Sequence, residues 1–385
     1  MELAGHECVG FCEFDKYAVM SYTAMHLCTQ EQLDYLATLP LKQRQKEILK
    51  DEYKNGEWYA NDVRRVDARD IPEADCWCFG FPCQDISVAG KGIGFNGKRS
   101  SLFFEVMRLL DEREANGLSR PGYLFIENVK NLLSVNRGGD FAKVLFALDE
   151  RGFDAEWQVL NSKNFGVPQN RERVFVVGHL RGRSTAEVFP VEGADGTHNI
   201  QGVIQVGLDG KSHRNNPNQY RVYDSEGVSP CLNQMGGGGR EPHIIDTKYR
   251  QKVVDVYDAY NKNWVGGDTC GTLTTNSMTS TTHSGTFELA FELATDKNSN
   301  QGIFGKVLED LTVYAVWYPK KQRYVAIRKL TPKECFRLQG WTDDYFEKAE
   351  FVNSNSQLYK QAGNGVTVCV VEEIAKRMHG YQEDH

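Results

Sequence analysis

The sequence predicts an α/β sheet with helices on its faces, interrupted by a smaller inserted domain. Up to about Leu180, short apolar runs alternate with segments of helical periodicity, which is typical of such a sheet. From Arg181 to about Tyr318 the composition shifts to Gly, Asn, Ser and Thr, and helical periodicity disappears. After Arg328 helical patterns return. We therefore expect an α/β domain over residues 1–180, a loop-rich domain over residues 181–318, and a C-terminal segment over residues 319–385 that returns to the first domain.

Hydrophobic periodicity and the residues typical of helix starts and ends predict the individual elements. Five apolar runs have the length and composition of strands, at residues 7–12, 75–79, 123–126, 156–160 and 174–177. Helical patterns lie between them at residues 16–28, 102–110 and 141–151, and Gly152 follows the last as a helix-ending glycine. Residues 29–55 are expected to form an extra helical insertion. Pro332 predicts a helix start with Thr331 as its cap, and residues 366–378 are apolar at helical spacing.

Composition narrows the class of protein. The chain has 385 residues, of which 40% are apolar and 25% charged, as in ordinary folded proteins. No apolar run of 18 residues is present and the first ten residues, MELAGHECVG, lack the pattern of a secretory signal. We therefore expect a cytoplasmic protein without a membrane span. Its ten cysteines, irregularly spaced, are then expected to be reduced thiols, one of which is a potential nucleophile.

Charge leaves a nucleic-acid partner open despite the net charge of −7. Screening limits the reach of a surface charge to about 8 Å at physiological salt, so local clusters matter more than the total. Residues 320–340 contain one acid, Glu334, among seven bases. These are Lys320, Lys321, Arg323, Arg328, Lys329, Lys333 and Arg337. This run is a candidate phosphate contact, although half of it could be a solvated helix face.

Cys83 follows an apolar strand in the segment DCWCFGFPCQ, residues 75–84. Nucleophiles in α/β folds sit at the carboxyl ends of strands. The next residues include four glycines with Lys91, Lys98 and Arg99, a loop that can close over a phosphate-bearing substrate. Cys76 and Cys78 raise zinc as an alternative, but no second pair of ligands follows, so we expect no metal.

Further polar residues are expected on the same rim of the sheet. Glu127 follows the strand at 123–126, with a helix-capping acid as the alternative reading. Gln169, Arg171 and Arg173 alternate along the chain and therefore share one face of a strand. The segment QAGNGV, residues 361–366, begins a helix with small residues where a backbone can approach a ligand closely.

The order and wording of these segments resemble the DNA (cytosine-5)-methyltransferases. FPCQ, ENV, QNRER, RKLTPKECFRLQGW and QAGNGV occur in that family's order and spacing. The resemblance covers nearly the whole chain outside its inserts. It implies a Rossmann-like, S-adenosylmethionine-dependent methyltransferase sheet with an inserted target-recognition domain at residues 181–318. It also implies a place in a restriction-modification system or a mobile element.

The resemblance assigns catalytic roles. Cys83 would add as a thiolate to carbon 6 of cytosine, which makes carbon 5 nucleophilic enough to take a methyl group. Glu127 would share or donate a proton at N3, and Arg173 would hold the exocyclic oxygen. Arg171 and Gln169 would position the ring, the backbone and the loop. Because the target atom is unreachable inside a duplex, the base would be swung out and the loop at 84–99 would close over it.

The methyl donor implied by the resemblance is S-adenosylmethionine. Glu13 is placed as the acid that binds the ribose hydroxyls, with Phe14 against the adenine. Asp62 and Val63 match the family's adenine-binding pair, although Asp62 could equally be a surface loop residue. The remaining wall of the pocket would consist of Pro82, Leu102, Asn364 and Val366.

The partner implied is double-stranded DNA, whose base edges the inserted loops would read in the major groove. An RNA methylase of the same fold is the weaker alternative, because a large recognition insert suits a duplex better. One departure concerns the family's opening strand and its Phe-x-Gly-x-Gly loop, which this sequence lacks. We expect a truncated start, with a second chain supplying the piece or a degenerate, DNA-binding remnant as the alternatives.

Overall fold

The fold is that of a computed structural model of the chain. It describes residues 1–82, 102–183, 185–193, 228–232 and 330–378, and in addition the strands at 205–208, 221–224, 243–246, 256–258, 263–265, 303–308, 311–318 and 323–329. The chain divides into two compact units. Unit 1 is Met1–Asn199, Ser229–Gly236 and Pro332–His385, and unit 2 is Ile200–Val228 and Gly237–Thr331. The three domain ranges expected from the sequence, together with the functions assigned to them, stay a prediction.

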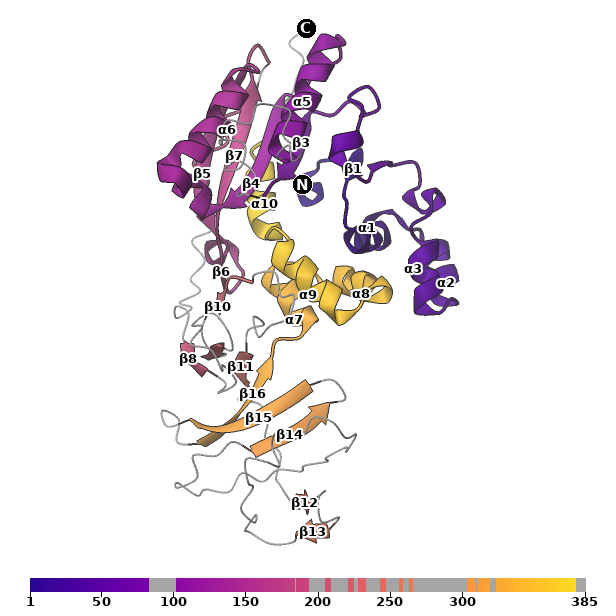
Figure 1. Ribbon diagram of the computed structural model, residues 1–385, viewed down its shortest axis with the longest axis vertical. Helices are drawn as coiled ribbons and strands as arrows, with labels where there is room; N and C mark the ends of the chain where they lie inside the picture. The colour runs from indigo at the N-terminus through magenta and orange to yellow at the C-terminus, as the bar shows by residue number, and fades with distance from the viewer. Residues whose placement is uncertain are drawn as a thin grey trace. The chain divides into compact units, whose positions relative to one another are not determined.

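A four-stranded mixed sheet in the order β3-β4-β7-β5 forms the centre of unit 1 (Figure 1). β3 (Cys76–Gly80) runs parallel to β4 (Tyr123–Val129), whereas β7 (Glu172–Leu180) runs antiparallel to β4 and to β5 (Phe153–Asn161). The carboxyl ends of β3 and β4 and the start of β7 therefore meet at one edge of the sheet. All four expected strands of this sheet are confirmed, with ends shifted by a few residues.

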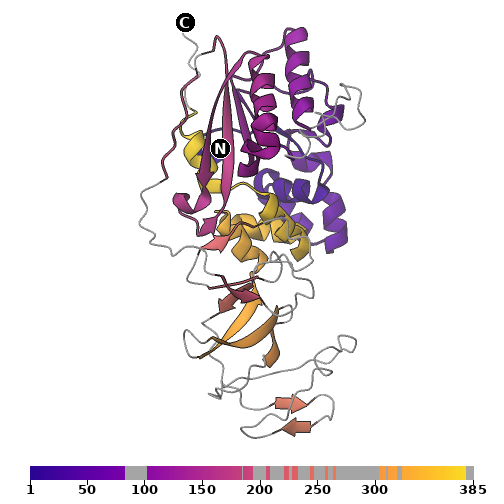
Figure 2. The ribbon, with the colours of Figure 1, turned by 60° about the vertical axis from the view of Figure 1, so that its left-hand side comes forward.

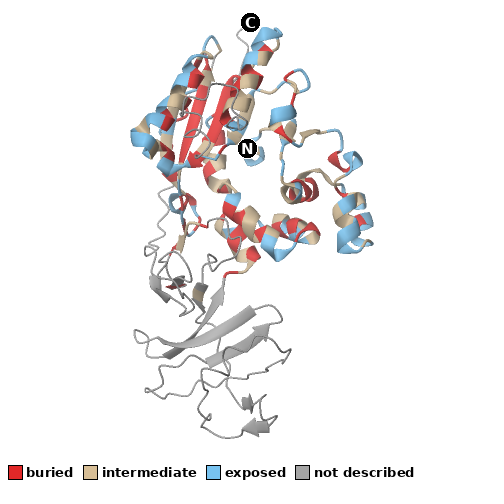
Figure 3. Ribbon diagram, in the orientation of Figure 1, coloured by how far each residue is buried: buried red, intermediate tan, exposed pale blue. Residues whose placement is uncertain are grey.

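The sheet is covered on both faces because its side chains alternate. Leu124 and Ile126 of β4 pack with α5 (Leu102–Ala115) and α6 (Gly139–Asp149). Tyr123 and Phe125 pack instead with α10 (Val368–Ala375). Figure 2 shows α5 and α6 on one side and α10, in yellow, on the other. Figure 3 shows that the central strands are largely buried, as expected for a sheet between two helical layers.

The first residues form a second, smaller sheet. β1 (Gly10–Cys12) pairs in parallel with β2 (Trp58–Ala60). α1 (Lys16–Tyr22) begins after Asp15, whose side chain accepts a hydrogen bond from the Tyr17 amide, and continues as a π-helix at Thr23–Leu27. The expected strand at 7–12 and helix at 16–28 are thereby confirmed in shorter form.

The expected helical insertion at residues 29–55 contains α2 (Gln30–Ala37) and α3 (Leu41–Glu47). α2 begins with a capping box between Thr29 and Gln32. Leu36 and Ile48 from this insertion pack against Val352 of α8 (Asp343–Val352). The insertion is thus anchored to the C-terminal helices of unit 1.

The C-terminal helices complete unit 1. α7 (Pro332–Leu338) has Pro332 at its first position, as the sequence predicts, and α9 (Asn355–Asn364) precedes α10. α10 packs its apolar residues Val370 and Ile374 on the sheet. No helix among the described residues is long and apolar enough to cross a membrane.

The described residues of unit 2 form strands and no helix, in agreement with the loss of helical periodicity. One sheet has the order β14-β15-β16-β11-β9-β8, and β12 pairs with β13 in a separate antiparallel ladder. The bounds are β8 (Gln205–Leu208), β9 (Arg221–Asp224), β11 (His243–Asp246), β12 (Val256–Asp258), β13 (Asn263–Val265), β14 (Ile303–Leu308), β15 (Leu311–Tyr318) and β16 (Arg323–Lys329).

Candidate active site

An ion pair between Glu127 and Arg173 lies at the edge where β4 ends and β7 begins. Arg173 lies opposite Val129 in the β4–β7 ladder, and its Nε is 2.9 Å from Glu127 Oε1. The two side chains are only 19% and 14% exposed. Burial raises the pKa of the Glu127 carboxyl above its ordinary value of 4.5, although Arg173 and Arg171 oppose the shift. Glu127 therefore holds a proton more readily than an exposed glutamate.

Glu127 also lies directly over the end of β3. Gly80 is its register partner, and a Cβ at Gly80 would be 3.3 Å from the Glu127 carbonyl oxygen and 3.6 Å from Oε2. One residue further on, Asn128 Nδ2 donates a 2.8 Å hydrogen bond to the Phe81 carbonyl oxygen. β4 thus fixes the chain that leads into Pro82 and Cys83. Cys83 itself and the predicted loop at 84–99 lie outside the described residues.

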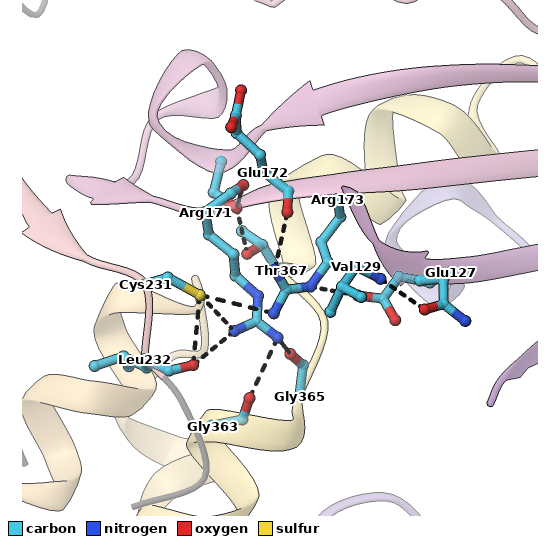
Figure 4. A network of polar contacts seen from close by, with 12 residues as sticks. Glu127, Val129, Arg171, Glu172, Arg173, Cys231, Leu232, Gly363, Gly365 and Thr367 are labelled. Carbon is cyan, nitrogen blue, oxygen red and sulfur yellow. Dashed lines mark hydrogen bonds and ion pairs between the residues drawn. The ribbon is translucent and has the colours of Figure 1, made fainter. Parts of the chain in front are cut away.

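Arg171 is buried and fully occupied at its two terminal nitrogens. Nη1 donates to the Leu232 carbonyl oxygen at 2.8 Å and to Cys231 Sγ at 3.5 Å. Nη2 donates to the carbonyl oxygens of Gly365 at 2.8 Å and Gly363 at 3.2 Å (Figure 4). Only its Nε, also buried, has no hydrogen-bond partner among the described residues. Burial first, and then Arg173, lower the pKa of Arg171.

Gln169 makes similar tethers beside it. Its Nε2 donates to the Leu338 carbonyl oxygen at 2.8 Å, and its Oε1 accepts from the Leu232 amide at 3.4 Å. Gln169 belongs to β6 (Gln169–Asn170), which pairs with β10 (Ser229–Pro230). Gln169 and Arg171 together hold the 229–232 segment and the α9–α10 connection against the sheet.

Cys231 is a site residue that the sequence does not reveal. Its Sγ lies 3.5 Å from Arg171 Nη1 and 3.7 Å from Arg173 Nη2, so it bridges the two guanidinium groups (Figure 4). Cys231 is one of the ten cysteines of the chain and lies in a loop-rich stretch of the sequence. The only local signal is its neighbour Pro230, which gives no indication of an arginine partner some sixty positions away.

Glu13 and Phe14 follow β1 at its carboxyl end. Glu13 Oε1 accepts from the Asp15 amide at 2.6 Å, and its own amide donates to the Ala60 carbonyl oxygen at 3.1 Å. The Phe14 side chain is 75% exposed. Asp15 in turn forms an ion pair with Lys360 of α9 at 2.6 Å. This contact ties the end of β1 to the helix that carries Asn364.

Asp62 and Val63 follow β2 on the neighbouring parallel strand. Asp62 caps a short 3₁₀ helix, Val63–Arg65, and both its carboxylate oxygens accept from Arg64 at 2.8 Å. The Arg64 hydrogen bond lowers the pKa of Asp62. Cys12, with Asp62 and Glu13 nearby, has its pKa raised to about 11, mainly by burial. Glu13 and Asp62, at the carboxyl ends of two paired strands, thus both help to raise the pKa of Cys12.

The remaining predicted pocket residues are spread over three elements. Pro82 is exposed just after β3, and Leu102 is the first residue of α5. Asn364 is exposed at the end of α9, whereas Val366 is half-buried and packs on the sheet core with α10. Three of them lie next to a residue already described: Pro82 follows Phe81, which Asn128 contacts, and Asn364 and Val366 lie on either side of Gly365.

Two further expectations concern charge and metal. In the part of the chain that the structure describes, no group of three or more His, Cys, Asp or Glu residues could hold a metal ion. In the basic run, Lys333 forms ion pairs with Asp343 at 3.2 Å and Glu347 at 3.0 Å. Arg337 pairs with Asp343 at 2.6 Å. These two bases are therefore already partnered within unit 1.

The chain is similar to the type II methyltransferase M2.ScrFI of Lactococcus lactis subsp. cremoris, with 30% identity over 97% of this chain and 92% of that protein. It is 28% identical to the orphan methyltransferase M.SPRI of Bacillus phage SPR, over 98% and 93% of the two chains. The crystal structure of S. pombe Dnmt2 methyltransferase shares the fold, with a TM-score of 0.53, 15% identity and coverage of 97% and 92%.

The sequence profile of C-5 cytosine-specific DNA methylases matches residues 1–380, which is nearly the entire chain. Its five ordered motifs and its sheet agree with that match. The chain belongs to the C-5 cytosine-specific DNA methylase family and is a DNA cytosine-5 methyltransferase.

Proposed function

We propose that the protein transfers a methyl group from S-adenosylmethionine to carbon 5 of a cytosine swung out of duplex DNA, using Cys83 as nucleophile. The observation that carries this proposal is the Glu127–Arg173 ion pair over Gly80, three residues before Cys83. A proton-retaining carboxyl and a guanidinium side by side match the two polar edges of a cytosine, N3 and the exocyclic oxygen. Their position at the end of β3 agrees with a nucleophile in the following turn.

The chemistry proceeds through a covalent adduct. The Cys83 thiolate adds to carbon 6 and turns the ring into an enamine, while Glu127 donates a proton to N3 and Arg173 binds the exocyclic oxygen. Carbon 5 then takes the methyl group, a base or water removes the carbon 5 proton, and elimination releases Cys83. The raised pKa of Glu127 supports its role as the donor of that proton.

Arg171 and Gln169 act in this proposal by holding the pocket together. The four hydrogen bonds of Arg171 end on carbonyl oxygens and a sulfur, so its terminal N–H groups are already engaged within the protein. Both residues instead fix the segment at 231–232, and Cys231 in turn contacts Arg173. Their contribution is therefore to keep Arg173 and Glu127 in register.

S-adenosylmethionine supplies the methyl group as an electrophilic sulfonium when bound. The residues after β1 fit its adenosine half, because Glu13 Oε2 has no hydrogen-bond partner among the described residues and the Phe14 ring is exposed. Asp62 fits less directly, since Arg64 takes both its oxygens. Val63, Pro82, Leu102, Asn364 and Val366 complete the proposed wall.

The DNA partner and the biological setting belong to the same proposal. The 181–318 region would read the target sequence in the major groove, and the 84–99 loop would close over the extruded base. M2.ScrFI is a type II methyltransferase and M.SPRI an orphan methyltransferase of a phage, which supports a restriction-modification system or a mobile element. An enzyme of such a bacterial or phage system would work in the bacterial cytoplasm, because the DNA lies there.

A covalent trap tests the proposal. The protein is incubated with S-adenosylmethionine and duplexes that contain 5-fluorocytosine, in which carbon 5 carries fluorine in place of the proton that elimination must remove. We expect a stable protein–DNA adduct whose mass spectrum places the base on Cys83, and no adduct with Cys83→Ser. Absence of an adduct across all candidate target sequences would contradict the proposed mechanism.

A second candidate function is a DNA-binding remnant that no longer binds the donor. It is favoured by one observation: among the described residues, β1 and β2 form a sheet separate from β3-β4-β7-β5. Calorimetric titration with S-adenosylmethionine separates the candidates, because the remnant predicts DNA binding without donor binding.

A further inference from the structure

A buried set of polar side chains holds the connection between α9 and α10. Gln339, just after α7, is 0% exposed, and Thr367 and Ser162 are 2% and 3% exposed. The sequence gives no hint of this set, because its members come from three distant segments. Buried polar groups are kept only when they are hydrogen-bonded, so the contacts of each are informative.

The Gln339 side chain is satisfied at both ends. Its Nε2 donates to the Ala362 carbonyl oxygen at 2.7 Å and to the Gly365 carbonyl oxygen at 3.4 Å. Its Oε1 accepts a 2.9 Å hydrogen bond from the Thr367 hydroxyl. The backbone joins in as well, since the Val368 amide donates to the Gln339 carbonyl oxygen at 2.9 Å. Gln339 thus spans the entire connection from Ala362 to Val368.

Thr367 continues the set toward the base-binding side. Its Oγ1 lies 2.7 Å from the Ser162 hydroxyl, and the Ser162 amide donates to the Arg171 carbonyl oxygen at 3.0 Å. The chain of contacts therefore runs from Gln339 through Thr367 and Ser162 to the backbone of Arg171. The Arg171 side chain leads back to the α9–α10 connection, because its Nη2 donates to the carbonyl oxygens of Gly363 and Gly365.

The Gly365 carbonyl oxygen is the point where the two halves meet. It accepts from Arg171 Nη2 at 2.8 Å and from Gln339 Nε2 at 3.4 Å. A carbonyl oxygen with two lone pairs can accept both. Because Gly365 separates Asn364 from Val366, this double contact sets the path of the backbone between the two proposed donor-site residues.

We propose that Gln339 and Thr367 are positioning residues for methyl transfer: they fix the Gly363–Val366 backbone so that Arg171 on one side and Asn364 and Val366 on the other stay in register. This inference rests on the proposed function, in which Asn364 and Val366 contact S-adenosylmethionine. The alternative is that the set merely stabilises unit 1. The two differ in what a defect at Gln339 does to a protein that is still folded.

The test replaces Gln339 by Met, which has similar length but no donor or acceptor for these bonds. A matched control is Gln158→Met, because the Gln158 amide likewise donates to and accepts from a backbone group, at Val191, with distances of 3.1 and 2.7 Å. Gln158 lies on β5 and outside the site. The Thr367→Val and Thr367→Ser pair adds a rescue arm, since serine keeps the hydroxyl.

Donor affinity and amide hydrogen exchange are then measured at a temperature where every variant is folded by circular dichroism. We expect the Kd for S-adenosylmethionine to rise about tenfold in Gln339→Met and in Thr367→Val, because both variants break the hydrogen bond between Gln339 and Thr367. Thr367→Ser and Gln158→Met should stay within about twofold of the parent. Amide hydrogen exchange of the peptide covering residues 361–368 should quicken in the first two variants only. The double variant should lose less than the product of the single losses, because both break the same bond.

The inference is overturned if Gln339→Met melts at a lower temperature but keeps the parent Kd and exchange rates, or if serine and valine at Thr367 behave alike. These readouts need no turnover. If the parent protein binds donor but forms no adduct in the covalent trap, the proposed function fails while the role of Gln339 is still measured. If the parent binds no donor, unchanged exchange at 361–368 in Gln339→Met overturns the inference and faster exchange supports the fixing of the backbone.

Discussion

At the scale of single residues, burial and the neighbouring arginines act on the pKa of Glu127 in opposite directions, and burial has the larger effect. The raised pKa means that the folded protein binds its proton more tightly than the unfolded chain does. Protonated Glu127 thus contributes stability that is fully present below about pH 4.5, the ordinary pKa, and is lost as the pH rises through the raised value. Glu127→Gln removes this dependence because the amide does not titrate.

We therefore expect the free energy of unfolding of the parent, relative to Glu127→Gln, to fall as the pH is raised from 4 to 8. Urea unfolding at a series of pH values measures it. The methyl-transfer rate of Glu127→Gln should drop by at least about 100-fold in single-turnover assays, as for loss of a positioned acid. A relative stability that rises with pH would mean that the Arg173 ion pair outweighs burial. An unchanged rate would return Glu127 to a purely structural role.

Asn128 is a second residue with a separable effect, because its side-chain amide donates a hydrogen bond to the Phe81 carbonyl oxygen. Asn128→Ala breaks the 2.8 Å hydrogen bond and leaves a buried carbonyl oxygen without that partner, which should lower stability by about 1–3 kcal/mol. We also expect slower adduct formation by Cys83 with little change in DNA affinity. Asn116→Ala is the control, since Asn116 makes the same kind of bond to Glu112 on an exposed surface. Equal losses in both variants would contradict the special position of Asn128.

Residue-scale prediction from sequence has a clear physical limit at this site. Glu127 and Arg173 could be singled out because each follows or begins an apolar strand, where chemistry is expected. Their pairing required the β4–β7 register, which no local pattern encodes. Gln339 and Cys231 were missed for the same reason: a buried amide or thiol is recognisable only by partners that are distant in the sequence.

At the scale of elements, periodicity located the strands and helices but not their ends. The strand expected at 123–126 extends to Val129, because Glu127 and Asn128 still pair with β7 although they are polar. The helix expected at 16–28 changes to a π-helix after Tyr22, since apolar spacing does not distinguish helical types. Tertiary pairing therefore decides the boundaries, and the active site lies at such boundaries.

The end of α9 gives a prediction at this scale. A Cβ at Gly365 would be 3.2 Å from the Gln361 carbonyl oxygen, in the turn that Arg171 and Gln339 hold. We expect Gly365→Ala to destabilise the protein by about 1–3 kcal/mol and to weaken donor binding. Gly139→Ala is the matched control, because Gly139 begins α6 with φ −62° and nothing lies within 4 Å of its Cβ position, so it should be neutral or stabilising by up to about 1 kcal/mol. Thermal melting and calorimetry measure both. A Gly365→Ala protein that melts and binds donor like the parent would show that the turn is not tightly held.

At the scale of the whole molecule, the distribution of charge matters more than its sum. The net charge of −7 would repel DNA if it were spread evenly, yet seven bases gather in residues 320–340. The ion pairs of Lys333 and Arg337 with Asp343 divide this run into a part already neutralised and a part that precedes it. The sequence could not make that division, because the acids that partner Lys333 and Arg337 follow in α8.

The division predicts how DNA binding depends on salt. If Lys320 and Lys321 contact phosphates, replacing each by Ala should reduce the slope of log K against log salt by about 0.9, because each contact releases condensed counterions. The weakening should be the same for target and non-target duplexes, since phosphate contacts carry no sequence information. Lys333→Ala, whose ammonium group already has two carboxylate partners, should leave the slope unchanged. Fluorescence anisotropy between 50 and 300 mM salt measures these slopes. Equal slopes for the parent and the Lys320/Lys321 variant would place the phosphate contacts elsewhere, and a reduced slope for Lys333→Ala would mean that DNA displaces its acidic partners.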